Sequence, residues 1–79
     1  MDYDRDKVDE VVLALLSLTM FGKGPGVRAW KGQDWETMDR LHTKGYISDP
    51  KSKAKSVVMT EEGEQRSQEL FEKHFARKG

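Results

Sequence analysis

The chain has 79 residues, no cysteine, and fourteen basic side chains that balance fourteen acidic ones. A chain this short buries only about 60% of the surface that its unfolded form exposes, so residues 1–79 are interpreted as one domain with a small core, packed efficiently or completed by a partner subunit. The lack of cysteine excludes thiolate metal sites and thiol chemistry and fits a reducing compartment. A formal charge of zero provides no global attraction to nucleic acid or to anionic lipid.

The longest apolar run, VVLALLSLTMF, extends from Val11 to Phe21 and is shorter than the roughly 20 residues that a membrane-spanning helix needs. Acidic residues outnumber basic ones before this run, whereas a secretory signal carries positive charge there. Together these features predict a cytoplasmic protein that does not enter a membrane.

A first helix is predicted from Asp4 or Asp6 to about Met20, because either aspartate can accept hydrogen bonds from the unpaired amides of a first turn. A period of 3.6 residues gives this helix two apolar stripes on different sides. The stripe expected to face the core comprises Val8, Val11, Val12, Leu15 and Leu18. The second stripe comprises Leu13, Leu16 and Met20.

The second stripe has two interpretations, because a helix that is apolar on two sides must be covered on two sides. The C-terminal helix covers it within the chain, or it forms the contact of a homodimer. A 79-residue chain has few elements with which to cover both stripes.

A glycine-rich segment, GKGPG from Gly22 to Gly26, ends the first helix. It lacks the GxxxxGK spacing of a phosphate loop and is interpreted as a turn. The sequence VRAW that follows predicts a short strand with Trp30 turned inward. Trp30 and Trp35 flank a basic segment that suggests a patch for single-stranded nucleic acid or a peptide, although burial of at least one of the two is the more common outcome in a small domain.

A second helix is predicted from Asp34 to Lys44, with Asp34 as its cap. Its buried side is expected to carry Trp35, Met38, Leu41 and His42. Gly45 ends this helix, and a left-handed conformation at Gly45 would place Tyr46 on Leu41 in a Schellman motif.

A hairpin and a third helix complete the predicted elements. Ile47 points inward from a short strand, DPKSKA forms a turn, and SVVMT is the half-buried return strand. Thr60 caps the last helix, whose first turn carries Glu61 and Glu62. One face of this helix comprises Leu70, Phe71, His74 and Phe75.

The string LHTKGYISDPKSKAKSVVMTEEG contains, in order, a helix-ending Lys-Gly, an isoleucine, a basic hairpin, and Met-Thr-x-x-Gly at the start of another helix. In this order it resembles the winged-helix transcription regulators over residues 35–75. The resemblance implies an α+β, mostly α, winged-helix-like fold with three helices and a two- or three-stranded β-hairpin wing. Over its full length the chain is also similar to a small bacterial family of uncharacterised function, a resemblance that implies no activity.

Two departures from the DNA-binding winged helices argue against base readout. Only the glycine-rich segment and VRAWKG lie between Met20 and Gln33, so the helix that supports a recognition helix is missing. The helix in the recognition position carries three acidic and two basic residues. DNA phosphates would repel a surface on which carboxylates are in excess. These charged residues are Asp34, Glu36, Asp39, Arg40 and Lys44.

The leading hypothesis is a non-enzymatic, winged-helix-like interaction module that self-associates through Leu13, Leu16 and Met20 of the first helix. The alternative is a nucleic-acid-binding transcription regulator. It would use the basic residues of two loop segments that contain no acidic residue. These cations are Arg28, Lys31, Lys51, Lys53 and Lys55. Lysines on a short edge hairpin also have a simpler role, since they prevent aggregation between strands.

No catalytic, metal or cofactor site is predicted. His42 and His74 are the only histidines, and no HxxxH or HxxE spacing occurs. Neither a nucleophile elbow nor a phosphate loop is present, and so small a domain offers little room for a substrate pocket.

Overall fold

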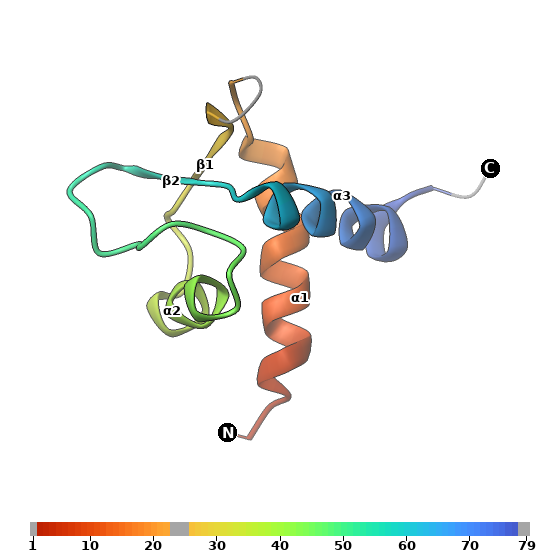
Figure 1. Cartoon of the computed structure of the whole chain (residues 1–79). Helices are drawn as coiled ribbons and strands as arrows, with labels where there is room; N and C mark the ends of the chain where they lie inside the picture. Colours follow the sequence, from red (N-terminus) through yellow and green to blue (C-terminus); the bar gives the residue numbers. More distant parts are fainter. Residues whose placement is uncertain (1, 23–25, 78–79) are drawn as a thin grey trace.

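The computed structural model describes residues 2–22 and 26–77, so residues 23–25 of the predicted glycine-rich turn lie outside the described residues (Figure 1). Helix α1 (Arg5–Leu16) continues into the short 3-10 helix η1 (Ser17–Thr19). Strand β1 (Arg28–Trp30), helix α2 (Trp35–Thr43), strand β2 (Ser56–Val58) and helix α3 (Glu61–Phe75) follow. Three helices and a small antiparallel sheet confirm the predicted mostly helical, winged-helix-like α+β fold.

Helix α1 begins as its sequence predicts but ends earlier. The Asp4 carboxylate caps it by accepting a 3.1 Å hydrogen bond from the Lys7 amide. The helix stops at Leu16 because the chain must turn toward β1: the Thr19 hydroxyl donates to the Leu16 carbonyl and accepts from the Trp30 amide. The α-helix therefore ends earlier than the predicted end at about Met20, although η1 continues the helical path to Thr19 with Met20 as its extended cap.

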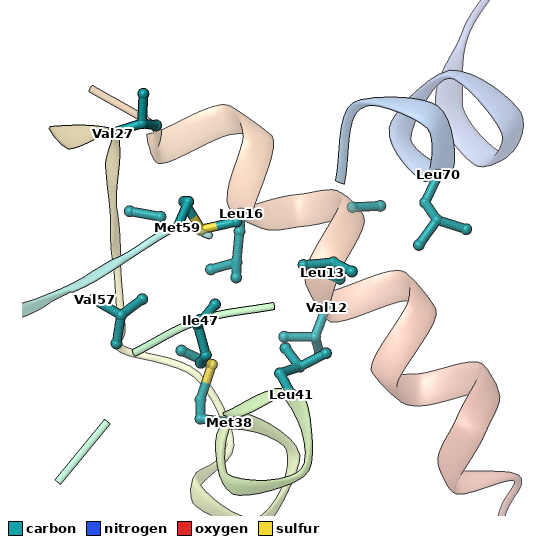
Figure 2. Packing of buried hydrophobic residues seen from close by; sticks show 12 residues of the cluster. Val12, Leu13, Leu16, Val27, Met38, Leu41, Ile47, Val57, Met59 and Leu70 are labelled. Atoms are coloured by element: carbon teal, nitrogen blue, oxygen red, sulfur yellow. The ribbon is translucent and has the colours of Figure 1, made fainter. Parts of the chain in front are cut away.

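The two stripes of α1 are buried differently from the prediction, although Val12 of the first stripe is buried as expected. Leu13 and Leu16 are each only 1% exposed, because α2 and α3 both pack on this part of α1 (Figure 2). By contrast, Leu18 from the stripe expected to be buried is 68% exposed. The C-terminal helix covers the second stripe within the chain, so Leu13 and Leu16 are not surface residues that can contact a second chain, and Met20 is half-buried against the same core.

Strand β2 lies between β1 and the segment that follows α2. It pairs with β1 in antiparallel register, with Ala29 opposite Val57 and Trp30 opposite Ser56. On its other side, Ile47 forms a bridge with Met59, which confirms the predicted hairpin. Trp30 does not turn inward as predicted, because side chains alternate along β1 and the buried positions are Val27 and Ala29.

Helix α2 has the predicted ends but a different buried side. Asp34 caps it by accepting from the Thr37 amide at 3.1 Å. At its end Gly45 has φ +85°, and the Tyr46 amide donates to the Leu41 carbonyl at 3.1 Å, as in a Schellman motif. The buried side is centred on Thr37 and Leu41, so Trp35 and His42, both predicted to be buried, are exposed.

Helix α3 lies across α1 (Figure 1) and completes the core. The Thr60 hydroxyl accepts from the Gly63 amide at 2.9 Å, as the sequence predicts for an N-cap. Of the four residues on its predicted apolar face, Leu70 is buried, Phe71 and His74 are half-buried, and Phe75 is exposed. Figure 2 shows Leu70 beside Leu13 and, farther away, the cluster of Met38, Ile47, Val57 and Met59 that joins the sheet to α2.

Candidate functional site

The loop between residues 50 and 55, called the wing here, extends away from the helices (Figure 1). Its lysines, Lys51, Lys53 and Lys55, are all exposed. The buried Pro50 anchors the start of the loop, and the Asp49 carboxylate accepts from the Lys51 amide at 2.9 Å. Within the described part of the chain, these three ammonium groups form no ion pair with a carboxylate.

Arg28 and Lys31 connect β1 to the wing. The Lys31 ammonium donates to the carbonyls of Pro50 at 2.8 Å and Ser52 at 2.6 Å. The Arg28 guanidinium donates to the Ser56 hydroxyl at 2.7 Å and to the Ser56 carbonyl at 2.8 Å. The fold thus brings all five cations of the nucleic-acid hypothesis to one end of the molecule, with three exposed and two also holding the wing in place.

Both basic residues of α2, the helix in the recognition position, form hydrogen bonds within the protein. The Arg40 guanidinium donates to both carboxylate oxygens of Asp9, at 2.8 and 3.0 Å, and the Lys44 ammonium donates to Asp9 at 2.7 Å. Glu36, by contrast, has a side chain that is 74% exposed. The outward surface of α2 therefore lacks the uncompensated cations that a helix in a DNA groove needs.

Asp9 is the charged group most deeply buried among the described residues, with a side chain only 2% exposed. Its hydrogen bond raises the pKa of Arg40 and also raises the pKa of Lys44, in each case against the opposing effect of burial. Asp6 contributes a second carboxylate to Lys44 at 3.2 Å. This cluster orients α1 relative to α2, and its charges compensate one another.

A cavity of about 290 Å³ lies where the three helices meet. Leu13, Leu41 and Leu70 contribute apolar walls, and Tyr46 and charged residues line the remainder. These charges are paired, since Lys44 contacts two aspartates and Arg66 lies 3.7 Å from Glu10. The cavity consequently presents little uncompensated charge to a ligand.

The two histidines lie in different settings. His42 Nδ1 is 3.0 Å from the Ile47 carbonyl oxygen, at the junction of α2 and the sheet. His74 Nε2 is 4.0 Å from Glu10 and has no hydrogen-bond partner among the described residues. Within residues 2–22 and 26–77, no group of three or more histidine, aspartate or glutamate side chains is arranged to hold a metal ion.

The sheet has an uncovered side that sequence reasoning missed. Phe21 pairs with Arg28 across a bridge, so both side chains lie on the same side of the sheet as Trp30. Phe21 and Trp30 are 53% and 52% exposed. The expectation that at least one tryptophan is buried is wrong, because Trp35 is 64% exposed as well. Phe21 appears in the sequence only as the end of an apolar run, which carries no sign of its pairing with β1.

Comparison with known proteins places these features in a family. The protein-family model DUF6429, which describes a domain of unknown function, matches residues 4–77. The uncharacterised protein y4hR of Sinorhizobium fredii is 53% identical over 77 residues, which cover 98% of this chain and 100% of that protein. No solved structure matches the chain significantly. None of the described helices has the length and apolar character needed to span a bilayer. The chain belongs to the DUF6429 family of domains of unknown function, and it has a small winged-helix-like fold.

Proposed function

We propose that the chain is a non-enzymatic binding module whose wing holds the phosphate backbone of nucleic acid. The observation that carries the proposal is the convergence of Arg28 and Lys31 with the three wing lysines, from positions 20 or more residues apart, at one end of the molecule. Each lysine that meets a phosphate releases condensed counterions, which favours binding even when the whole protein carries no net charge.

The rest of the surface supports backbone contact over base readout. The bases of α2 are bound to Asp9, and its outward side chains include Glu36. Contacts between lysines and phosphates fix position and carry no sequence information. The proposed binding is therefore independent of sequence and strongly dependent on salt.

The first test is fluorescence anisotropy with a labelled duplex of arbitrary sequence over a series of salt concentrations. We expect replacement of Lys51, Lys53 and Lys55 by Gln to weaken binding and to lower the slope of log affinity against log salt by about 2 to 3, since each lysine contributes about one unit. The matched control replaces three exposed cations elsewhere, Lys7, Lys73 and Arg77, by Gln. An equal loss of affinity in both triple variants would show that net charge, and not the wing, determines binding. If neither a duplex nor a single strand binds at low salt, the proposal is refuted.

A second candidate function is self-association through the opposite stripe of α1. Val8, Val11 and Leu15 are half-buried, and Leu18 is the most exposed large apolar side chain among the described residues. These side chains recur at helical spacing on one side of the helix, so a second copy of the chain would cover them. This candidate retains the first helix as the contact and moves the contact to the stripe that the fold leaves outside.

Static light scattering tests this candidate. We expect a dimer at high micromolar concentration that Leu18→Glu converts to a monomer, because a carboxylate would have to be buried at the contact. Gln33→Glu, which adds the same charge at an exposed position outside α1, is the control and should leave the dimer intact. A wild-type monomer at that concentration would rule out this function.

A further inference from the structure

The side of the sheet that faces away from the core is called the outer sheet face here and comprises Phe21, Arg28, Trp30, Ser56 and Val58. The bridge between Phe21 and Arg28 and the pairing of Arg28 with Val58 align three side chains across it. Trp30 lies opposite Ser56 in the next row. Arg28 thus lies between two exposed aromatic rings, with Phe21 across the strand and Trp30 two residues along it.

Exposed aromatic rings are unusual on the solvent side of a sheet, which in an antiparallel arrangement is expected to be polar. Neither ring contributes to the core, since about half of each side chain is exposed. The Trp30 indole lies close to Gly32, because the position of a Cβ added to Gly32 would be only 3.0 Å from Trp30 Nε1. A flat ring that is half exposed to solvent is suited to stack on another flat group.

The edge of β1 is closed to another strand. The Arg28 amide and carbonyl are both hydrogen-bonded to Phe21, each at 2.9 Å, and the Trp30 amide donates to the Thr19 hydroxyl. A peptide or a second copy that added a strand here would have to break these bonds. A partner must therefore approach the face of the sheet and not its edge.

The charge of this surface selects the class of partner. Arg28 uses only part of its guanidinium on Ser56, which leaves further N–H groups for an anion. No carboxylate belongs to the outer sheet face, and at the end of β1 Lys31 and Lys55 pair through their backbones and continue into the wing. A partner that joins flat groups through a negatively charged chain would match these aromatic rings and basic residues. Nucleic acid has this structure, since its bases are flat and its phosphates are charged.

Single strands fit the outer sheet face better than duplexes. In a duplex the bases are stacked on one another, so exposed aromatic rings cannot reach their flat surfaces without unstacking them. A single strand presents its bases to Phe21 and Trp30 while its phosphates meet Arg28 and the wing lysines. The acidic outward surface of α2 gives no compensating contact for a duplex groove.

We propose that the outer sheet face binds single-stranded nucleic acid by stacking bases on Trp30 and Phe21, with the wing holding the backbone. This inference rests on the proposed function, because the same wing supplies the phosphate contacts. It adds that the nucleic acid is single-stranded, and it names the residues that distinguish a single strand from a duplex. The charge of the wing alone does not make this distinction.

The test compares a labelled 15-nucleotide oligothymidine with a 15-base-pair duplex at the same low salt, using the full chain. We expect tighter binding of the single strand, and a loss of roughly tenfold for it in Trp30→Ala and in Phe21→Ala. Duplex binding, which depends on the lysines, should change less than about twofold. Trp35→Ala is the matched control, since Trp35 is exposed on α2 outside this face and should leave both affinities unchanged.

Intrinsic fluorescence gives a second readout, which reports contact between the oligonucleotide and the indole ring itself. With Trp35→Phe the remaining indole is Trp30, and oligothymidine should quench it. With Trp30→Phe the remaining indole is Trp35, and quenching should be absent. Circular dichroism checks that each variant is folded, which is expected because both side chains are largely exposed.

The outcomes separate the two proposals. Binding of neither nucleic acid would overturn both. If the lysine variant loses affinity while Trp30→Ala and Phe21→Ala bind the single strand as the wild type does, the wing proposal stands and the stacking proposal fails. Light scattering that shows a wild-type dimer and a Trp30→Ala monomer would identify a second copy of the chain as the partner and would also overturn stacking.

Discussion

At the scale of single residues, Gly63 shows how closely the start of α3 approaches the chain at the end of α2. It lies in the first turn of α3 and is buried, and a Cβ added there would collide with the backbone carbonyl of Tyr46. The Thr60 hydroxyl beside it donates to the Gly45 carbonyl at 2.7 Å and accepts from the Gly63 amide. The Met-Thr-x-x-Gly pattern therefore has a physical basis: the threonine connects two helix ends, and the glycine lets them approach.

Replacing Gly63 by Ala should destabilise the protein by about 2 to 3 kcal/mol, because backbone must move to admit the methyl group. This effect opposes the gain of about 1 kcal/mol that alanine normally brings to a helix. Urea denaturation measures the difference. Gly26→Ala, at a position with open space, should change stability by less than about 0.5 kcal/mol, and an equal effect at both positions would contradict the close approach.

At the scale of elements, the relative placement of α1 and α2 depends on a charge that the chain buries. Asp9 interrupts the apolar part of α1, and α2 supplies Arg40 and Lys44 to it at hydrogen-bond distance. A buried carboxylate without partners is costly, so α2 must place both cations toward α1. The same requirement engages both bases of α2 with Asp9, whereas the exposed Glu36 carries an acid on the outward surface of this helix.

Asp9→Asn should lower the free energy of unfolding by about 2 to 3 kcal/mol, since it replaces the buried charged acceptor shared by Arg40 and Lys44 with a neutral one. Asp6→Asn is a close control, because Asp6 also contacts Lys44 but has a side chain that is 90% exposed. The control should cost less than about 1 kcal/mol. Equal losses for the two variants in chemical denaturation would show that the buried cluster does not hold the helices together.

At the scale of the whole molecule, the chain has the helix, wing and helix order of a winged helix, and its described residues form no supporting α-helix between α1 and α2. Strand β1 occupies that part of the chain and pairs with the wing strand β2. A supporting helix at this place would position the recognition helix for a DNA groove. The strand β1 instead extends the sheet and widens its outer face. This substitution explains why the proposed binding uses the wing and the sheet instead of α2.

Most local elements follow from the sequence because local chemistry decides them. Asp4, Asp34 and Thr60 cap helices because their side chains reach amides three residues away. Gly45 ends α2 because glycine adopts a positive φ without a steric penalty. The basic character of the wing and the acidic character of α2 are equally visible in the sequence, and so is the order of helices and strands.

Only the tertiary structure decided which side of each element faces the core. The two stripes of α1 are similarly apolar, and the crossing of α3 selected Leu13 and Leu16 for burial while Leu18 stayed outside. The orientation of Trp30 likewise depends on the pairing of β1 with β2, whose partners are 26 to 30 residues apart. Periodicity identifies a face, but the choice between two faces depends on contacts between residues distant in the chain. For the same reason, the convergence of the five cations and the outer sheet face was decided by the fold.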